Sequence, residues 1–280
     1  MGNGPRQVVP GQPAAAPRVG LLTSAGQPAT GDGRWQGGIL IDPETGAVSY
    51  RVEACTIDNA EARAVAARGG TVSWDTYEVG TGIRCSTFGV HGRDWRAQAT
   101  RALEPAAERQ IGEELWTGAL AIAGGLPNGY LAAPGSEPLG AHEPLDALGE
   151  LEEYLAGCGT GQRGMIHATR AVITRWVADN LVRREGAVLL TAFDTVVVGS
   201  TGYPGTGPRT LTDGELSAPA QGVWAYATGM VDVRRGPPLI VGDPAATINP
   251  DTNDVVVRAE QTALASWDLV CHAAAEITLA

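Results

Sequence analysis

Apolar residues recur at helical spacing along one long stretch of the chain, residues 94–123. Intervals of three and four residues place these side chains on one face of a helix, and arginines and glutamates fill much of the rest. The pattern predicts a spine helix of roughly 25 residues, about 37 Å long, with a kink or a break at Pro105, which lacks a backbone donor. The apolar positions are Trp95, Ala99, Ala102, Leu103, Ala106, Ala107, Ile111, Leu115, Ala119 and Leu120.

Shorter apolar runs before the spine predict strands and one small helix. Residues 39–41 and 47–52 flank a turn with Pro and Gly, which is typical of a hairpin. An alanine-rich helix is expected up to Ala67, capped by Asp58 or Asn59. Residues 71–79 are rich in β-branched and aromatic side chains and should form a strand.

After the spine, a loop rich in Gly and Pro is expected over residues 124–143, and then a compact mixed block. Pro144 should start a helix, Thr169 should cap another, and residues 165–168 between them should form a short strand. This order of strands and helices predicts an α+β fold. Further strands are expected over 187–193, 195–198, 222–234 and 254–259, a loop over 199–214, and one long extended piece over 263–279.

The N-terminal residues show no periodicity at all. Residues 1–34 contain five prolines and seven glycines and have little to bury, so alone they should form an extended, disordered arm. We expect a neighbouring subunit to hold such an arm in place.

Charge and composition exclude several classes of function. The net charge is −11 and all 20 basic residues are Arg, which excludes chemistry that needs a lysine amine, such as Schiff bases and lysine–asparagine crosslinks. The acidic balance argues against sequence-reading nucleic-acid binding, which needs a basic face. No run of 18 apolar residues occurs, and no basic segment precedes an apolar one at the N-terminus, so neither a membrane span nor a secretory signal is expected.

Candidate metal ligands are sparse. Four cysteines form no CxxC pair and match no zinc-module spacing, so we expect buried free thiols, with a disulfide or metal role as the alternative. Three spine glutamates could in principle bind a metal ion, but no ExxH motif accompanies them, and a solvated or intersubunit face is preferred. The residues are Cys55, Cys85, Cys158 and Cys271, and Glu108, Glu113 and Glu114.

Candidate catalytic motifs are weak. Residues 159–164 match GxGxxG formally, but a helix is expected before them and a strand after them, so we interpret them as a turn. Ser200 does not lie in GxSxG, and Asp268 and His272 should share one face of a strand without a nucleophile. A Ser–His–Asp site could still assemble in space, but we expect no catalytic, cofactor-binding or metal site. The four histidines are His91, His142, His167 and His272.

Longer strings carry a family resemblance. Residues 84–121, RCSTFGVHGRDWRAQATRALEPAAERQIGEELWTGALA, resemble the spine-helix region of major capsid proteins from tailed phages of actinobacteria. Further matching strings follow in the expected order, and together they cover about two-thirds of the chain, whereas residues 1–80 match less clearly. These strings are 158–167, 184–186, 199–205, 259–263 and 267–273.

The resemblance implies the Hong Kong 97-type capsid fold, an α+β fold with named parts. The chain would then begin with an N-terminal arm and an extended β loop, continue with a peripheral domain that contains the spine helix and an axial domain, and return to the peripheral domain. The implied ranges are 1–36, 37–80, 81–143, 144–225 and 226–280.

The resemblance also implies a structural protein, not an enzyme, which assembles as pentamers and hexamers into an icosahedral phage head around double-stranded DNA. Scaffold, portal and decoration proteins would be partners, DNA would be contacted nonspecifically if at all, and the chain would reside in the virion after assembly in the host cytoplasm. Without Lys, isopeptide crosslinks are impossible and the shell must hold noncovalently. Two alternatives stay open: an encapsulin-type shell around a protein cargo, and a hydrolase with a spatially assembled site that would use His167 or Ser200. A capsid subunit confined to vertices is a further possibility.

Overall fold

The computed structural model describes residues 17–28, 33–41, 71–86, 94–158, 163–209, 216, 222–241, 248–249 and 254–279. None of the described helices is long and apolar enough to cross a membrane. The helices are α1 (Leu21–Ser24), the 3-10 helix η1 (Arg34–Gly37), α2 (Trp95–Thr117), α3 (Ala119–Gly124), α4 (Pro144–Cys158) and α5 (Arg170–Ala178).

The described strands form one small and two larger sheets. Their bounds are β1 (Ile39–Ile41), β2 (Val72–Trp74), β3 (Tyr77–Ser86), β4 (Glu137–His142), β5 (Gly164–His167), β6 (Arg183–Glu185), β7 (Val188–Leu190), β8 (Val196–Val198), β9 (Gly222–Gly229), β10 (Asp232–Arg235), β11 (Leu239–Val241), β12 (Ile248–Asn249), β13 (Asp254–Ser266) and β14 (His272–Thr278).

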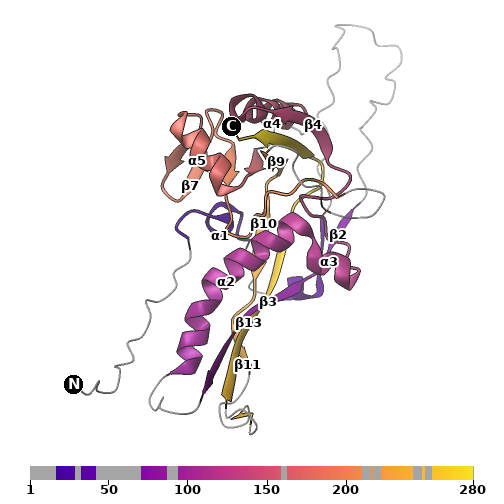
Figure 1. Cartoon of the computed structure of the whole chain (residues 1–280). Helices are drawn as coiled ribbons and strands as arrows, with labels where there is room; N and C mark the ends of the chain where they lie inside the picture. The colour runs from indigo at the N-terminus through magenta and orange to yellow at the C-terminus, as the bar shows by residue number, and fades with distance from the viewer. Residues whose placement is uncertain are drawn as a thin grey trace, which may run out of the picture.

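The predicted spine helix is α2, which runs diagonally through the molecule (Figure 1). It begins where Asp94 accepts a hydrogen bond from the Ala97 amide at 2.9 Å, which satisfies one of the free N–H groups of the first turn. Of the kink or break predicted at Pro105, the break is wrong, because α2 continues through this residue. The helix ends instead at Gly118, whose φ of 62° is left-handed and easily adopted by glycine. Residues 119–124 therefore form a separate helix, α3, where the sequence predicted one spine.

Beneath the first half of α2 lies the five-stranded sheet, centred on β13. Strands β3 and β13 pair antiparallel over ten residues and form the long ladder visible in Figure 1. The Gln110 side-chain amide fastens α2 to this ladder: its oxygen accepts from the Gly80 N–H and its nitrogen donates to the Gly80 carbonyl, each at 2.8 Å. A small apolar cluster completes the contact and consists of Ala99, Leu103, Val257 and Ala259.

The seven-stranded sheet has the order β4-β14-β9-β5-β8-β7-β6. Helices α4 and α5 pack together on one face through a cluster that includes Leu151 and Trp176. Two predictions are wrong here. The predicted loop over 124–143 contains β4, which pairs parallel with β14. The predicted extended piece over 263–279 is interrupted at residues 267–271, where Leu269 has a φ of 58° and the chain passes from one large sheet to the other.

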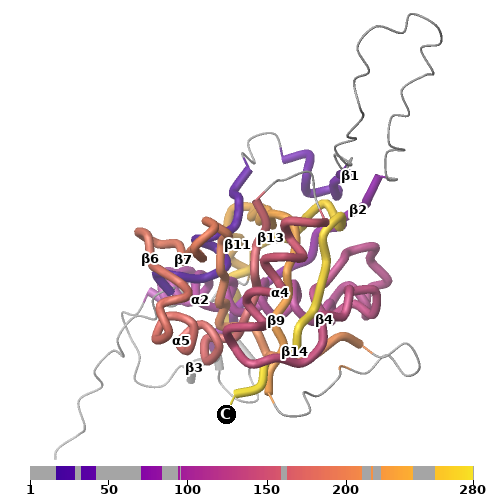
Figure 2. Tube along the Cα trace, turned by 90° about the horizontal axis from the view of Figure 1, so that it is seen from above, coloured from indigo at the N-terminus to yellow at the C-terminus, as the bar shows by residue number. Residues whose placement is uncertain are grey.

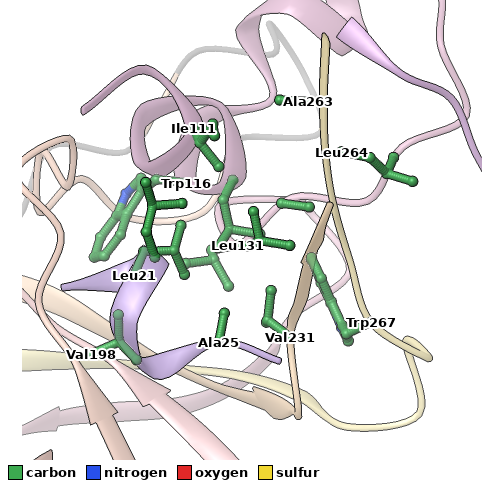
Figure 3. Close-up of a cluster of buried hydrophobic side chains, with 14 of the residues drawn as sticks. Leu21, Ala25, Ile111, Trp116, Leu131, Val198, Val231, Ala263, Leu264 and Trp267 are labelled. Carbon is green, nitrogen blue, oxygen red and sulfur yellow. The ribbon is translucent and has the colours of Figure 1, made fainter. Parts of the chain in front are cut away.

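The main core lies between the second half of α2 and the other face of the seven-stranded sheet (Figure 3). Leu21 from α1, Trp116 from α2 and Val198 from β8 all point into it. Aromatic rings in this core pack edge to face or tilted. The centroids of the Trp116 and Tyr226 rings, for example, are 4.9 Å apart. This cluster therefore joins the N-terminal segment, the spine helix and both large sheets.

The predicted hairpin is only partly visible. Residues 39–41 form β1, whose described partner is β2, paired antiparallel with Leu40 opposite Ser73. The expected second hairpin strand (47–52) and the expected helix up to Ala67 lie outside the described residues. The predicted strand over 71–79 is confirmed as β2 and the start of β3, and the strands predicted after the second helix are confirmed as β7 and β8.

Candidate functional site

Two carboxylates on the inner side of α2 are buried, Glu108 and Glu114. The Glu108 Oε1 atom accepts a hydrogen bond from the Leu21 amide at 2.8 Å, and its Oε2 atom accepts one from the Leu22 amide at 2.9 Å. Both amides belong to the first turn of α1, where N–H groups have no partner within the helix. Glu108 therefore caps α1, and the predicted solvated face is wrong at this residue.

Glu114 repeats this arrangement in the last turn of α2. Its carboxylate accepts hydrogen bonds from the Leu120 amide at 2.7 Å and the Ala121 amide at 2.8 Å, in the first turn of α3. Burial raises the pKa of Glu114, and the two amides oppose that shift. Only Glu113 of the three glutamates is exposed, as predicted. Within the described residues, no group of His, Cys, Asp and Glu could hold a metal ion.

The cap on α1 holds a segment that we call the N-terminal strap, residues 17–28. The Gly26 amide donates to the Val231 carbonyl at 2.9 Å, and the Val233 amide donates to the Gly26 carbonyl at 2.8 Å. The strap also contacts β7 and β8 through α1. These contacts fix residues 17–28 to the body of their own subunit, so the expectation of an extended, disordered arm is wrong for this segment. Residues 1–16 lie outside the described part of the chain.

His167 is fully buried in β5 and both of its ring nitrogens are occupied. The Thr228 hydroxyl donates to the Gly229 carbonyl at 2.7 Å, so it accepts the Nε2–H of His167 at 3.0 Å. The Nδ1 atom is then left to accept the Tyr203 hydroxyl at 2.8 Å. Burial lowers the pKa of His167 to about 3, and His272 adds to the shift. His167 is therefore a neutral, satisfied core residue.

Ser200 is also buried and serves the packing of α2 on the seven-stranded sheet. Its hydroxyl donates to the Glu108 carbonyl at 3.1 Å and accepts from the Gly202 amide at 3.2 Å. A Cβ added at Gly112 would lie 2.1 Å from the Ser200 Oγ atom, so the two chains approach here because position 112 is glycine. No described hydrogen bond joins Ser200 to His167, so the two candidate residues of the hydrolase alternative form no catalytic pair.

Asp268 and His272 do not share a strand face as predicted. Asp268 lies in the turn before β14, and its side chain accepts a hydrogen bond from the Val270 amide at 3.1 Å. His272 begins β14 and donates from Nε2 to the Leu131 carbonyl at 2.7 Å. Burial lowers the pKa of His272, so this imidazole also acts as a neutral donor inside the core.

The cysteines give a correction. Cys158 and Cys271 form a disulfide, with their Cα atoms 5.6 Å apart and a sequence separation of 113. The prediction of free thiols is therefore wrong for this pair, and the disulfide, which was the alternative, is correct. The bond ties the end of α4 to the residue before β14. Cys55 lies outside the described residues, as does the side chain of Cys85.

The GxGxxG string lies between a helix and a strand, as predicted. Helix α4 ends at Cys158 and β5 begins at Gly164, with residues 159–162 outside the described chain. A Cβ at Gly164 would lie 2.5 Å from a Leu155 methyl carbon, so this glycine lets α4 pack closely on β5. No helix opens on its last glycine, so the geometry that binds a dinucleotide pyrophosphate does not arise.

A groove of about 740 Å³ opens between α4 and the segment around the β7–β8 turn. Phe193 at its rim is 80 % exposed, and Leu145 is 59 % exposed. The Glu152 carboxylate accepts a hydrogen bond from the Thr195 hydroxyl at 2.7 Å, so it is engaged in the wall. A groove with apolar walls and a rigid, exposed aromatic ring is more typical of a surface that binds another molecule than of a catalytic site. Further lining residues are Leu148, Leu155, Arg163 and Leu181.

The features that sequence reasoning missed are structural links, not reactive groups. Glu114 precedes Gly118 and the apolar run of α3, and that order is the signal that could have indicated a cap. Glu108 caps a helix that begins 87 residues earlier in the chain, so no local pattern indicates it. The same holds for the disulfide, whose cysteines become neighbours only when α4 packs on β14.

No protein-family model matches this sequence, and no curated protein matches it either. Solved structures do match over nearly the full length. A chain from Gordonia phage Cozz has a TM-score of 0.54 at 13% identity, covering 99% of this chain and 92% of that chain. The capsid of an empty GTA particle, computed with C5 symmetry, has a TM-score of 0.53 at 11% identity, and the match covers 99% of this chain and 96% of that chain. The holo-SrpI encapsulin complex from Synechococcus elongatus PCC 7942 has a TM-score of 0.54 at 14% identity, and the match covers 99% of this chain and 92% of that chain.

The matched structures are capsids and an encapsulin, and the match spans both large sheets and the spine helix. The α+β prediction is confirmed. The chain has the Hong Kong 97-type fold of capsid shell proteins.

Proposed function

We propose that this chain is the major capsid protein of a tailed actinobacteriophage and that it assembles into the shell of the phage head. The observation that carries the proposal is the likeness to shell subunits over almost the whole of both chains. The ordered strings that resemble actinobacteriophage capsid proteins support it independently, as does the likeness to a chain from Mycobacterium phage Cain, with a TM-score of 0.53. The role is structural, and we expect no catalytic activity.

The subunit would form pentamers and hexamers that close into an icosahedral container for double-stranded DNA. In this arrangement α2 and the five-stranded sheet belong to the peripheral domain, and α4, α5 and the seven-stranded sheet belong to the axial domain. Because β4 and β14 pair within the seven-stranded sheet, we assign residues 137–142 and 272–278 to the axial domain. The proposed arm and extended β loop, residues 1–36 and 37–80, stay predictions.

The shell would be held without covalent crosslinks between subunits, because a chain without Lys cannot form isopeptide bonds. Each subunit would contact several neighbours, so modest pairwise contacts would add up to a stable shell. Scaffold, portal and decoration proteins are the expected partners. Because the net charge of the subunit is −11, it would contact DNA nonspecifically if at all. The subunit would be located in the virion and would assemble in the host cytoplasm.

An encapsulin-type shell is the second candidate, because the likeness to an encapsulin subunit has a TM-score of 0.54, equal to that of the Gordonia phage chain. The two candidates differ in contents: a phage head encloses DNA, whereas the compartment would enclose protein.

The contents of native particles test the proposal. Particles that carry this chain should be purified from their producing cells, treated with nuclease and then opened. Long nuclease-protected double-stranded DNA is the expected result. Protein cargo without DNA would favour the encapsulin candidate, and the absence of the chain from any particle would overturn both.

A further inference from the structure

Residues 267–271, which we call the junction, carry the chain from the five-stranded sheet to the seven-stranded sheet. Leu269 has a φ of 58°, a left-handed conformation that is uncommon for a bulky residue. Asp268 supports this bend, because its side chain accepts a hydrogen bond from the Val270 amide at 3.1 Å. The junction is therefore a bend of defined shape between the two large sheets.

Noncovalent packing fixes both ends of the junction. Before it, the ring of the buried Trp267 lies against that of Trp74, with centroids 4.9 Å apart. After it, the His272 amide donates to the hydroxyl of Tyr154 in α4 at 3.0 Å. Leu155 joins α4 to an apolar cluster that also contains side chains of β14, and α4 lies beside β14 when seen from above (Figure 2). These contacts bring the end of α4 to the end of the junction without any covalent bond.

The two cysteines of the disulfide are neighbours because of this packing. In the reduced chain the same contacts would hold the Cys158 and Cys271 thiols close together, which gives each a high effective concentration toward the other. Cys158 is half-buried, whereas only 7 % of Cys271 is exposed. The Cys158 sulfur is therefore the one that a small dissolved reagent reaches first.

The proposed place of assembly does not favour this bond. Disulfides are rare in cytosolic proteins, because small thiols and thioredoxin keep cysteines reduced there, and they persist in oxidising surroundings outside the cell. A shell subunit that assembles in the host cytoplasm and resides in the released virion passes from the first environment to the second. Its cysteine pair therefore experiences both conditions, in a fixed order.

We propose that Cys158 and Cys271 form a thiol–disulfide exchange site that stays reduced during assembly and closes after release, so that oxidation fixes the junction in the finished shell. The reagent is a small disulfide of the glutathione disulfide class. The Cys158 thiolate attacks one of its sulfurs and releases one small thiol, and the Cys271 thiolate then attacks the Cys158 sulfur and releases the second. The two electrons and two protons that the cysteines lose end on the two small thiols. The inference rests on the proposed shell function.

Trapping the thiols tests when the bond forms. Producing cells are quenched with acid, which protonates thiolates and stops exchange, and the chain is then denatured and labelled with a maleimide. Mass spectrometry of unreduced peptides should find labelled Cys158 and Cys271 in particles from intact cells. Released particles treated with glutathione disulfide should give one joined peptide pair. A pair already joined in intact cells, or cysteines that still take the label after treatment, would overturn the inference.

The lifetime of the shell tests what the bond does. Reduced particles and particles treated with glutathione disulfide are diluted into urea, and light scattering follows the loss of shells. Treated shells should last about 10-fold longer or more, because the crosslink restricts the unfolded chain. Equal lifetimes of treated and reduced wild-type shells would overturn the inference.

The variant C158S/C271S is the matched control. It should assemble like the wild type, and its shells should last as long as reduced wild-type shells with or without treatment. C158S alone, which changes only the half-buried partner, serves the same purpose if the double variant does not fold.

Failure of this inference is distinguishable from failure of the proposed function. A wild-type chain that never assembles would contradict the shell function. The trapping measurement on that unassembled chain would still decide whether the two thiols stay reduced in the cell and close afterwards.

Discussion

At the scale of single residues, Glu108 ties the N-terminal strap to α2 through two backbone amides. A buried amide that loses its acceptor costs about 1–3 kcal/mol. We therefore expect Glu108→Ala to lower the free energy of unfolding by about 2–4 kcal/mol, measured by urea denaturation. Hydrogen exchange at Leu21 and Leu22 should accelerate in the same variant.

Glu113→Ala is the control, because this glutamate lies on the same helix but is exposed. It should change the unfolding free energy by no more than about 0.5 kcal/mol. Equal effects of the two substitutions, or unchanged exchange at the strap amides in Glu108→Ala, would show that the strap does not depend on this carboxylate.

His167 makes stability depend on pH. Its pKa is lowered to about 3 in the folded protein, whereas an unfolded histidine titrates near 6.5. Below about pH 6.5 the unfolded chain therefore binds a proton that the folded chain does not, and the free energy of unfolding should fall as the pH falls toward 3. The lowered pKa of His272 acts in the same direction, and the raised pKa of Glu114 acts in the opposite one.

Urea denaturation at several pH values between about 8 and 5 measures this slope. His167→Gln should flatten it, because glutamine does not titrate. A wild-type stability that stays constant over this range, or a slope that survives His167→Gln, would contradict the burial of a neutral imidazole at this position.

At the scale of elements, the disulfide fastens α4 to the β14 end of the sheet. A crosslink that closes a loop of about 100 residues stabilises a protein by about 4–5 kcal/mol in the chain-entropy account. Reduction should therefore lower the melting temperature of the oxidised chain, as measured by calorimetry with and without a phosphine reductant. The variant C158S/C271S should melt at the lower temperature and not respond to reductant. An oxidised wild-type chain whose Cys158 and Cys271 still titrate as free thiols would contradict the bond.

Elements with strong periodicity were predictable, and the places where they stop were not. The apolar stripe predicted α2, whose 23 residues are close to the predicted length of roughly 25. The stripe continues past the end of the helix, because Gly118 ends α2 through a left-handed φ that a periodic pattern does not reveal. Strand β4 was missed because it is an exposed edge strand with Pro138 and Gly140, a composition that resembles a loop. The turn after Trp267 was missed because apolar residues continue on both sides of it.

At the scale of the whole molecule, the shell fold was predictable from the order of several strings, none of which is a catalytic signature. The contacts that hold the fold together were not, because Glu108 with the strap and Cys158 with Cys271 join residues that are 86 or more positions apart. The strap shows this most clearly: its glycines and prolines indicate an arm, yet the carboxylate that fixes residues 17–28 lies in the middle of α2.

Negative-stain electron microscopy of the purified chain would show whether copies of this chain build a closed shell. We predict closed particles of uniform diameter, accompanied by free rings of five or six subunits in the slower fractions of a sedimentation profile. A chain that remains a compact monomer or small oligomer at every concentration and salt condition, also when the phage's scaffold protein is supplied, would show that it does not build a shell.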